Sequence, residues 1–444
     1  MVRDSIEQQF ARRTSGSREL WERGSAVMPS GVSAAVKYFP PYPIYLERAE
    51  GSQVWDVDGN RYVDLVLGGS SHLLGHGHPA VKQAVHAQVD RFNQHLSPSA
   101  LEVEMAELLI ATFPYLECVR FTNTGSEAIR SCIRIARAIT GRTMLGKCEG
   151  HYHGSDDPVL VSGANVAGEV DRPTGAPDSA GIPGYIVDDV LVLPFNAADA
   201  ATALIEENAD RLAAVLIEPI AFSTGGGIAA EPSFVRALRE VTARHGILLI
   251  YDEVATGLRL RGGAAQFLEV QPDLSCVGKT ICSGYSLAAF GGSGELMEAT
   301  LGLRAADQGT QIFQSGTFSA NPVALAAGIA TLTVFREEDV STRVDEVATL
   351  IRSGLDQLFS ARRIPACTVG AASILQVHFA EKPPRNRRDI LAGDLSKLRR
   401  FHLGLLVEGI FWTPIHPAVT CSAHSNADVD EVLNAVDRVL GRLT

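Results

Sequence analysis

Between about residues 75 and 330, amphipathic stretches that predict helices alternate with short apolar runs that predict strands. Two of these short runs are 214–218 and 247–251. Alternation of this kind favours a mostly parallel sheet that is covered by helices on both faces. The middle of the chain is therefore predicted to be an α/β domain.

One helical repeat begins directly after a turn of small and hydroxyl residues. Its apolar positions follow the 3.6-residue period, with arginines between them: Ala128, Ile129, Cys132, Ile133, Ala136 and Ile139. Thr124, with Glu127 three residues later, fits a capping box, which is an ordinary way to start a helix. The same turn could also bind an anion, because backbone N–H groups and the hydroxyls of Thr124 and Ser126 meet at a helix N-terminus. The residues alone leave both interpretations open.

The two ends of the chain carry different patterns. Residues up to about 45 indicate an amphipathic helix and an extended arm, and 45–67 indicate a small meander of strands. From about 340 to 444, helices and strands alternate again, and 383–388 is predicted to be a loop. We therefore predict an N-terminal arm and meander over 1–74, a large domain over 75–330 and a small α+β domain over 331–444.

Composition is that of an ordinary globular enzyme, with 444 residues of which 46% are hydrophobic and 20% are charged. The net charge of −12 is spread along the sequence, which argues against nucleic acid or an anionic membrane as a partner. No run approaches the ~20 apolar residues of a membrane span. Residues 1–10 carry acids and lack the apolar core of a signal peptide, so we expect a cytoplasmic protein.

The cysteines and histidines do not form a metal-binding pattern. Seven cysteines contain no CxxC pair, and we expect small core residues in a reducing compartment. His151 and His153 stand two residues apart without a third ligand in pattern, so no metal is expected.

An acid and an amine follow two of the expected strands. Asp252 ends the apolar run 247–251, and Lys279 comes 27 residues later (279 − 252 = 27). Ligands of parallel sheets bind at the carboxyl ends of strands, where both residues would lie. Such a pair suits pyridoxal phosphate, since the acid can protonate the ring nitrogen and the amine can carry the aldehyde as a Schiff base. Taken alone, a capping aspartate and a surface lysine explain the pair as well.

Further motifs run along nearly the whole chain. They lie at 55–60, 74–79, 121–128, 149–154, 217–219, 252–259, 278–279, 291–292 and 316–322. With these motifs in this order, the chain resembles the class III aminotransferases of the fold-type I pyridoxal-phosphate superfamily. Its closest resemblance is to the glutamate-1-semialdehyde aminomutase-like branch. The expected fold is therefore a mainly parallel sheet of the seven-stranded type, with helices on both faces and a smaller α+β domain.

The resemblance implies roles for the residues around the cofactor ring. Lys279 would hold the aldehyde and then shuttle a proton, and Asp252 would pair with the pyridinium nitrogen. Val254 would press on one face of the ring, and Tyr152 would stack on the other. All four are therefore candidate cofactor residues, with Lys279, Asp252 and Tyr152 as the catalytic group.

The resemblance also implies contacts at the edge of the cofactor. Thr124, Gly125 and Ser126 would bind the phosphate. Thr317 matches the position that reaches the phosphate of a neighbouring subunit, which implies a homodimer with shared active sites. Glu218 and Ser223 match positions beside the 3′-oxygen, although the aminomutase branch has an amide where Ser223 stands. Arg259 also matches a common family arginine, and a structural ion pair is its expected role.

Substrate recognition is where the chain departs from that branch. Ala34 and Lys37 stand where aminomutases have a serine and an arginine, and Gly69 lies near their tryptophan position. Residues 414–420 contain no glutamate, although the branch has one near this strand. Relatives that accept β-amino acids use an arginine near the same turn, where His416 stands here. Lys37, His72 and His416 are therefore the candidate substrate residues.

These departures favour an aminotransferase that moves nitrogen from an amino acid or amine to an oxo acid acceptor. The reaction would proceed in two half-reactions, a ping-pong mechanism. The alternative is an intramolecular aminomutase of the glutamate-1-semialdehyde type, or a racemase on the same cofactor. A non-catalytic regulator with this fold would usually lack the lysine, and Lys279 is present.

Overall fold

The computed structural model describes residues 5–298, 300, 312–414 and 416–443. Its contacts divide the chain into two compact units, each of which is described by itself. The small unit comprises Met1–His78, Thr342–Pro384 and Ile390–Thr444, and the large unit comprises Pro79–Ser341 and Arg385–Asp389. These boundaries differ from the predicted ones at 74/75 and 330/331, because the contacts change at 78/79 and 341/342 and 385–389 belongs to the large unit.

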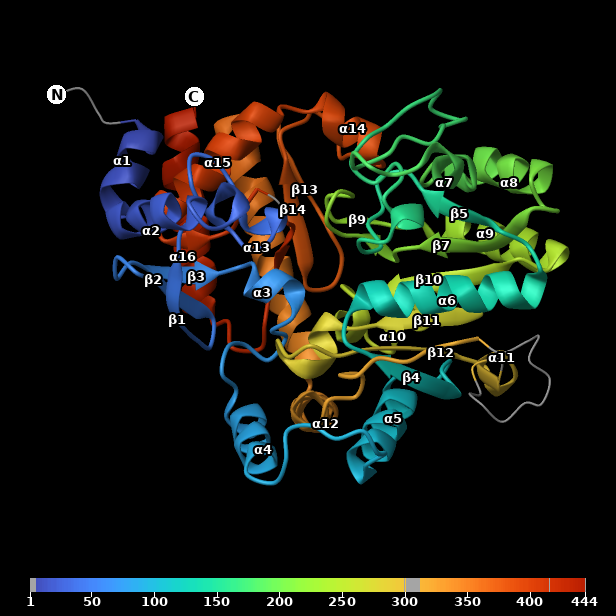
Figure 1. Ribbon diagram of the computed structural model, residues 1–444. Helices are drawn as coiled ribbons and strands as arrows, with labels where there is room; N and C mark the ends of the chain where they lie inside the picture. The colour runs from blue at the N-terminus through green and yellow to red at the C-terminus, as the bar shows by residue number, and fades with distance from the viewer. Residues whose placement is uncertain (1–4, 299, 301–311, 415, 444) are drawn as a thin grey trace. The chain divides into compact units, whose positions relative to one another are not determined.

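A seven-stranded sheet forms the centre of the large unit (Figure 1). In spatial order its strands are β4 (Cys118–Thr122), β12 (Ala288–Gly292), β11 (Leu274–Val277), β10 (Leu248–Glu253), β7 (Leu212–Ile217), β5 (Met144–Cys148) and β6 (Val190–Leu193). Only β12 runs antiparallel to its neighbours, β11 and β4. The prediction of a mainly parallel α/β sheet is confirmed.

The central strands are buried along their whole length, which explains their continuous apolar runs. Every residue of β5, β7, β11 and β12 is buried, as expected for strands with both faces covered. The helices of this unit are α4 (Pro79–Val89), α5 (Ala100–Thr112), α6 (Gly125–Thr140), α7 (Gly184–Asp188), α8 (Ala198–Glu207), α9 (Pro232–His245), α10 (Gly263–Leu268), α11 (Gly294–Glu298) and α12 (Pro322–Glu337). A short hairpin of β8 (Ile220–Ala221) and β9 (Ile228–Ala229) lies outside the main sheet.

Helix α6 packs its apolar stripe against the centre of the sheet. Ala128, Ile129 and Cys132 of the helix share one core cluster with Ile250 of β10 and Cys276 of β11. Ile139 is the exception to the predicted stripe, since its side chain is exposed one residue before the helix ends. Side chains alternate along a strand, so Asp252 points to the same face of β10 as Ile250.

The small unit joins the two ends of the chain in one sheet. The N-terminal meander of β1 (Leu46–Glu50), β2 (Gln53–Asp56) and β3 (Arg61–Asp64) is extended by β15 (Ile410–Phe411), which runs parallel to β3. A second sheet contains β13 (Cys367–Val369), β14 (Ile374–His378) and β16 (Ala418–Val419). The helices are α1 (Ile6–Arg13), α2 (Ser15–Ser25), α3 (Leu67–Ser70), α13 (Val340–Arg362), α15 (Leu395–Val407) and α16 (Asn426–Leu443); α14 (Arg387–Ala392) begins in the large unit.

Two further features concern the thiols and the helices. All seven cysteines are free thiols, and five are buried, whereas Cys118 is exposed and Cys367 is half-buried. Among the helices of the described residues, none combines the length and hydrophobicity of a membrane-spanning segment.

Candidate active site

A cavity of about 160 Å³ opens in the large unit beside the carboxyl end of β10 and the N-terminus of α6. Its lining residues are Gly125, Ser126, Ile129, Tyr152, His153, Gly154, Glu218, Phe222, Ser223, Asp252, Val254, Ala255 and Lys279. The structure thus gathers all of the predicted cofactor residues except Thr124 and Thr317 around one cavity. These residues come from segments that are far apart in the sequence and that the fold brings to one place.

The turn before α6 is shaped by glycine and by a half-formed cap. The Thr124 hydroxyl accepts a hydrogen bond from the Glu127 N–H at 3.3 Å, as a capping residue does. The Glu127 carboxylate, however, accepts from the Asn123 N–H at 2.8 Å and not from Thr124, so the predicted capping box is only partly formed. A Cβ on Gly125 would lie 2.7 Å from the Val254 side chain, so only glycine leaves this wall of the cavity as it is.

Lys279 lies just beyond β11 in an unusual backbone conformation. Its φ of 43° lies in the left-handed region, which costs a residue with a side chain about 1–3 kcal/mol and is typical of functional sites. Burial lowers the pKa of its amine, while the carboxylates of Asp252 and Glu218 oppose that shift and Arg259 adds to it. The amine lies 5.1 Å from the centre of the Phe222 ring. A larger fraction of the amine is therefore neutral and nucleophilic than in water.

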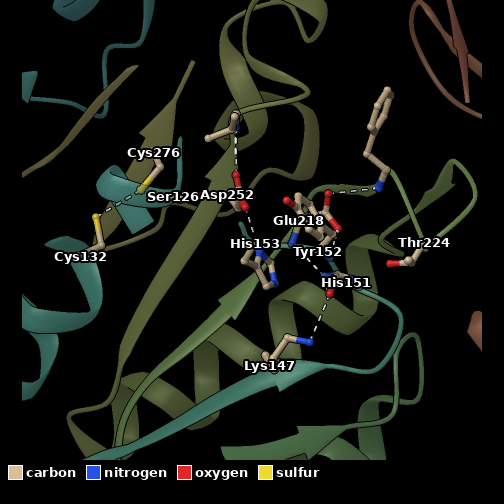
Figure 2. A network of polar contacts seen from close by, with 12 residues as sticks. Ser126, Cys132, Lys147, His151, Tyr152, His153, Glu218, Thr224, Asp252 and Cys276 are labelled. Atoms are coloured by element: carbon tan, nitrogen blue, oxygen red, sulfur yellow. Dashed lines mark hydrogen bonds and ion pairs between the residues drawn. The ribbon is translucent and has the colours of Figure 1, made fainter. Parts of the chain in front are cut away.

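Asp252 is held in place by a buried histidine (Figure 2). Its Oδ2 lies 2.9 Å from Nδ1 of His153, and its Oδ1 accepts from the Val254 N–H at 3.0 Å. Burial lowers the pKa of His153, although Asp252 opposes the shift. A neutral His153 then donates its Nδ1–H to the carboxylate and fixes the plane of Asp252. In the sequence, this histidine stands out only as a candidate metal ligand.

Glu218 links three segments of the site through hydrogen bonds. Its Oε2 accepts from the Tyr152 N–H at 2.9 Å and its Oε1 from the Phe222 N–H at 3.2 Å. Its own N–H donates to Nδ1 of His151 at 3.0 Å. Burial and the nearby charge of Asp252 raise the pKa of Glu218 to about 8. The carboxyl group is therefore mainly protonated at neutral pH and can donate as well as accept.

Lys147 is a fully buried lysine below this network, and sequence reasoning did not find it (Figure 2). It lies in β5, and its ammonium donates to the carbonyl oxygens of His151, at 3.2 Å, and of Val161. Burial lowers its pKa to about 8. A lysine inside an otherwise apolar strand was the signal available in the sequence. Its hydrogen bonds hold the segment that carries Tyr152.

The remaining predicted residues lie outside this cavity. Thr317 is exposed in the large unit, and its carbonyl accepts a hydrogen bond from the Gln94 side chain. Lys37, His72 and His416 belong to the small unit. Lys37 is exposed and donates to the Ser33 hydroxyl at 2.9 Å, while burial and the neighbouring His76 lower the pKa of His72 to about 4.

The two histidines beside Tyr152 are each engaged through Nδ1, His151 with the Glu218 N–H and His153 with Asp252. Across the described ranges, no group of three or more side chains is arranged to hold a metal ion. Arg259, which was expected to form a structural ion pair, is buried and acts electrostatically on Lys279.

Two comparisons of the sequence show what the chain is similar to. Residues 34–436 match the family model described as aminotransferase class-III. The chain is 37% identical over 422 residues to a glutamate-1-semialdehyde 2,1-aminomutase of Methanothrix thermoacetophila, covering 94% of this chain and 95% of the relative.

Solved structures agree with this placement. An omega-transaminase from Sphaerobacter thermophilus superimposes with a TM-score of 0.91 and 32% identity, over 98% of this chain and 99% of that one. A glutamate-1-semialdehyde-aminomutase from Pseudomonas aeruginosa PAO1, in complex with PMP, gives a TM-score of 0.88 and 26% identity, over 99% and 97% of the two chains.

Proposed function

Since this chain belongs to the class III aminotransferases, which use pyridoxal phosphate, we propose that it moves an amino group on or between small amino and carbonyl compounds. The observation that carries the proposal is the cavity that Lys279 and the buried Asp252 both line. Fold alone would not carry it, because this kind of fold supports several reactions.

The residues of the cavity fit pyridoxal phosphate. Lys279 offers a buried amine of lowered pKa for the aldehyde, and Asp252 offers a fixed carboxylate for the ring nitrogen. The N–H groups of Gly125 and Ser126 at the start of α6, together with the Ser126 hydroxyl, suit the phosphate. Val254 packs against Gly125, and Tyr152 presents a partly exposed ring to the cavity. Two apolar surfaces for a flat ring are thus available.

The chemistry that pyridoxal phosphate supplies when bound is the withdrawal of electrons from the carbon that bears the amino group. We assign Asp252 to keep a proton on the ring nitrogen, with His153 holding the carboxylate in the required plane. Lys279, once its nitrogen is free, takes a proton from the substrate carbon and returns one, which its lowered pKa favours. Glu218 and Ser223 are assigned to the 3′-oxygen, and the protonated form of Glu218 can donate to it.

Two versions of amino transfer differ in where the nitrogen goes. The aminomutase named among the relatives supports an isomerase, which needs no separate acceptor, more strongly than it supports our first expectation. We therefore place an amino shift within one substrate, of the glutamate-1-semialdehyde 2,1-aminomutase type, first. Transfer from a donor to an oxo acid is the second candidate.

Two observations support transfer to an oxo acid as the second candidate. The solved omega-transaminase has 32% identity to this chain, more than the solved aminomutase at 26%. Ala34, Lys37 and Gly69 also depart from the aminomutase recognition pattern expected from the sequence. Lys37, His72 and His416 remain our proposed substrate residues, and a single-charge lysine would bind a carboxylate more loosely than an arginine.

We further propose that the working form is a homodimer of cytoplasmic chains. Support for the dimer comes from three exposed apolar side chains. Leu96, Phe313 and Phe318 are 89%, 77% and 60% exposed. Leu96 and Phe318 stand on neighbouring segments, since Asn321 donates to the carbonyl of Asn93 at 2.9 Å. Exposed apolar clusters of this kind commonly mark protein interfaces.

A nitrogen-tracing experiment tests the reaction. The protein, loaded with pyridoxal phosphate, is given ¹⁵N-labelled glutamate 1-semialdehyde, with or without pyruvate. Isomerised product that forms equally without pyruvate, and no labelled alanine, would establish the amino shift. Formation of the dioxo acid together with labelled alanine, only when pyruvate is present, would establish intermolecular transfer. Lys279→Ala should retain bound cofactor but lose at least about 1,000-fold in turnover, and a fully active variant would refute the assignment.

A further inference from the structure

A short arginine-rich segment of the large unit forms hydrogen bonds and ion pairs with loops around the cavity. Arg385–Asp389 belongs to the large unit, although the chain on both sides of it belongs to the small unit. Each of its three arginines has its own binding partners. Arg385 binds the Glu231 carboxylate at 2.7 Å, and Arg388 binds the Glu149 carboxylate at 2.7 and 2.9 Å.

Arg387 differs from Arg385 and Arg388 because its hydrogen-bond partners are backbone carbonyls alone, whereas each of the other two also binds a carboxylate. Its Nη1 donates to the carbonyl of Thr224 at 3.0 Å, and its Nε and Nη2 donate to the carbonyl of Ala164 at 3.3 and 3.1 Å. Burial lowers its pKa, and the carboxylates of Asp178 and Glu149 oppose that shift from a distance. A half-buried guanidinium whose hydrogen bonds go to neutral carbonyls gains no ion pair to offset its desolvation, which indicates that its position and not its charge pairing is what matters here.

The same side chain closes the space between two cavity loops. A Cβ added to Gly150 would lie 2.7 Å from the Cβ of Arg387, and Gly150 has a φ of 88°. The Thr224 hydroxyl donates to the carbonyl of Gly150 at 2.8 Å. Arg387, Gly150 and Thr224 therefore form one three-way contact. Gly150 lies two residues before Tyr152, and Thr224 directly follows Ser223.

We propose that Arg387 is a positioning residue for this active site. It sets the spacing between the loop that carries Tyr152 and His153 and the loop that carries Glu218, Phe222 and Ser223. It touches neither loop's cavity-lining side chains, and it acts through the backbone of both loops. The inference rests on the proposed function only in taking pyridoxal phosphate as the occupant of the cavity.

The segment offers a matched control. Arg385→Met removes an arginine two residues away whose partner, Glu231, lies outside the cavity and whose ion pair is exposed, so it should contribute little. In Arg387→Met, Arg385 and Arg388 still anchor the segment. Arg387→Lys is a milder second variant, because one ammonium cannot donate to Thr224 and Ala164 in the forked geometry of a guanidinium.

The test uses the holoenzyme without substrate, which separates it from the question of which reaction the enzyme performs. We expect cofactor release from Arg387→Met to be about tenfold faster than from wild type, with a changed visible circular dichroism band. Arg387→Lys should fall between the two, and Arg385→Met should match wild type. The midpoint of thermal unfolding of the cofactor-free proteins should agree within a few degrees.

With a substrate, Arg387→Met should lower kcat more than it raises KM, because the loops hold the cofactor and not the substrate. Release rates and dichroism equal to wild type in both Arg387 variants would overturn the proposal. So would an equal change in Arg385→Met, because the effect would then belong to the segment as a whole. A wild-type protein that binds no pyridoxal phosphate would instead refute the proposed function.

Discussion

Glu218 shows how strongly position in the fold changes the chemistry of a single residue. Its oxygens accept from the backbone of Tyr152 and Phe222, and the fixed charge of Asp252 lies close by. Burial and Asp252 favour the neutral form more than the two N–H donors favour the charged one, so the pKa rises to about 8. The site thereby keeps the Glu218 carboxyl group mainly protonated at neutral pH.

This raised pKa predicts how stability depends on pH. Because the folded state holds the Glu218 proton up to about pH 8 and the unfolded chain releases it near its ordinary pKa of 4.5, stability falls as pH rises between those values. The slope is up to about 1.4 kcal/mol per pH unit. In the cofactor-free protein, Glu218→Gln should remove this part of the slope between pH 6 and 8. Urea unfolding at each pH measures it, and parallel curves for the two proteins would contradict the prediction.

The residues that hold the catalytic groups were harder to predict than the groups themselves. Lys279 and Asp252 follow strands that are visible in the sequence, and motifs known from a family mark them. His153 and Arg387 act on partners 99 and 163 residues away, so no local pattern reveals the pairing. The segment predicted as a loop at 383–388 is irregular only to residue 386, since α14 begins at Arg387, and the sequence gives no sign that its arginines bind other loops of the large unit.

At the scale of elements, the start of α6 and the end of β10 form one wall of the cavity. Sequence periodicity predicted both elements, because each has a strong apolar pattern, and only the capping of α6 differs in detail. Their fit depends on Gly125, whose missing side chain leaves room for Val254. This close approach is a property of the packed elements and could not be predicted from either one alone.

Gly125→Ala should therefore weaken cofactor binding. The new methyl group would lie 2.7 Å from Val254 and push it into the cavity, so we expect the Kd for pyridoxal phosphate to rise about tenfold or more. Gly184→Ala is the matched control, since Gly184 also begins a helix and a Cβ there meets nothing within 4 Å.

A double variant tests directly whether residue 125 and Val254 are in contact. Val254→Ala removes the two methyl groups nearest to the added Cβ, and the remaining contact with the Val254 Cβ is 3.3 Å. Gly125→Ala combined with Val254→Ala should therefore bind the cofactor more tightly than Gly125→Ala alone. Titration of the cofactor-free proteins followed by absorbance gives all four constants. Strictly additive losses would show that the two residues do not meet as proposed.

At the scale of the whole molecule, Leu96 and Phe318 of the large unit form an exposed apolar surface of the kind that often contacts another protein chain. Gln94 and Asn321 form hydrogen bonds that hold the segment of Leu96 beside the segment of Thr317 and Phe318. Thr317 lines no part of the cavity of its own chain. A second copy of the chain would cover the apolar side chains and could bring its Thr317 to the neighbouring cavity, as the family resemblance implies.

The assembly can be tested by placing charge on this surface. Wild type should have about twice the 47.4 kDa mass of one chain by light scattering. Leu96→Glu combined with Phe318→Glu should shift the mass towards one chain at micromolar concentration, because two carboxylates would lose their hydration in the interface. Tyr185→Glu changes an exposed aromatic residue, 74% exposed, elsewhere in the large unit and should leave the mass unchanged.

If Thr317 completes the neighbouring site, the separated chains should also bind pyridoxal phosphate more weakly. Full binding by a stable single chain would contradict the shared site.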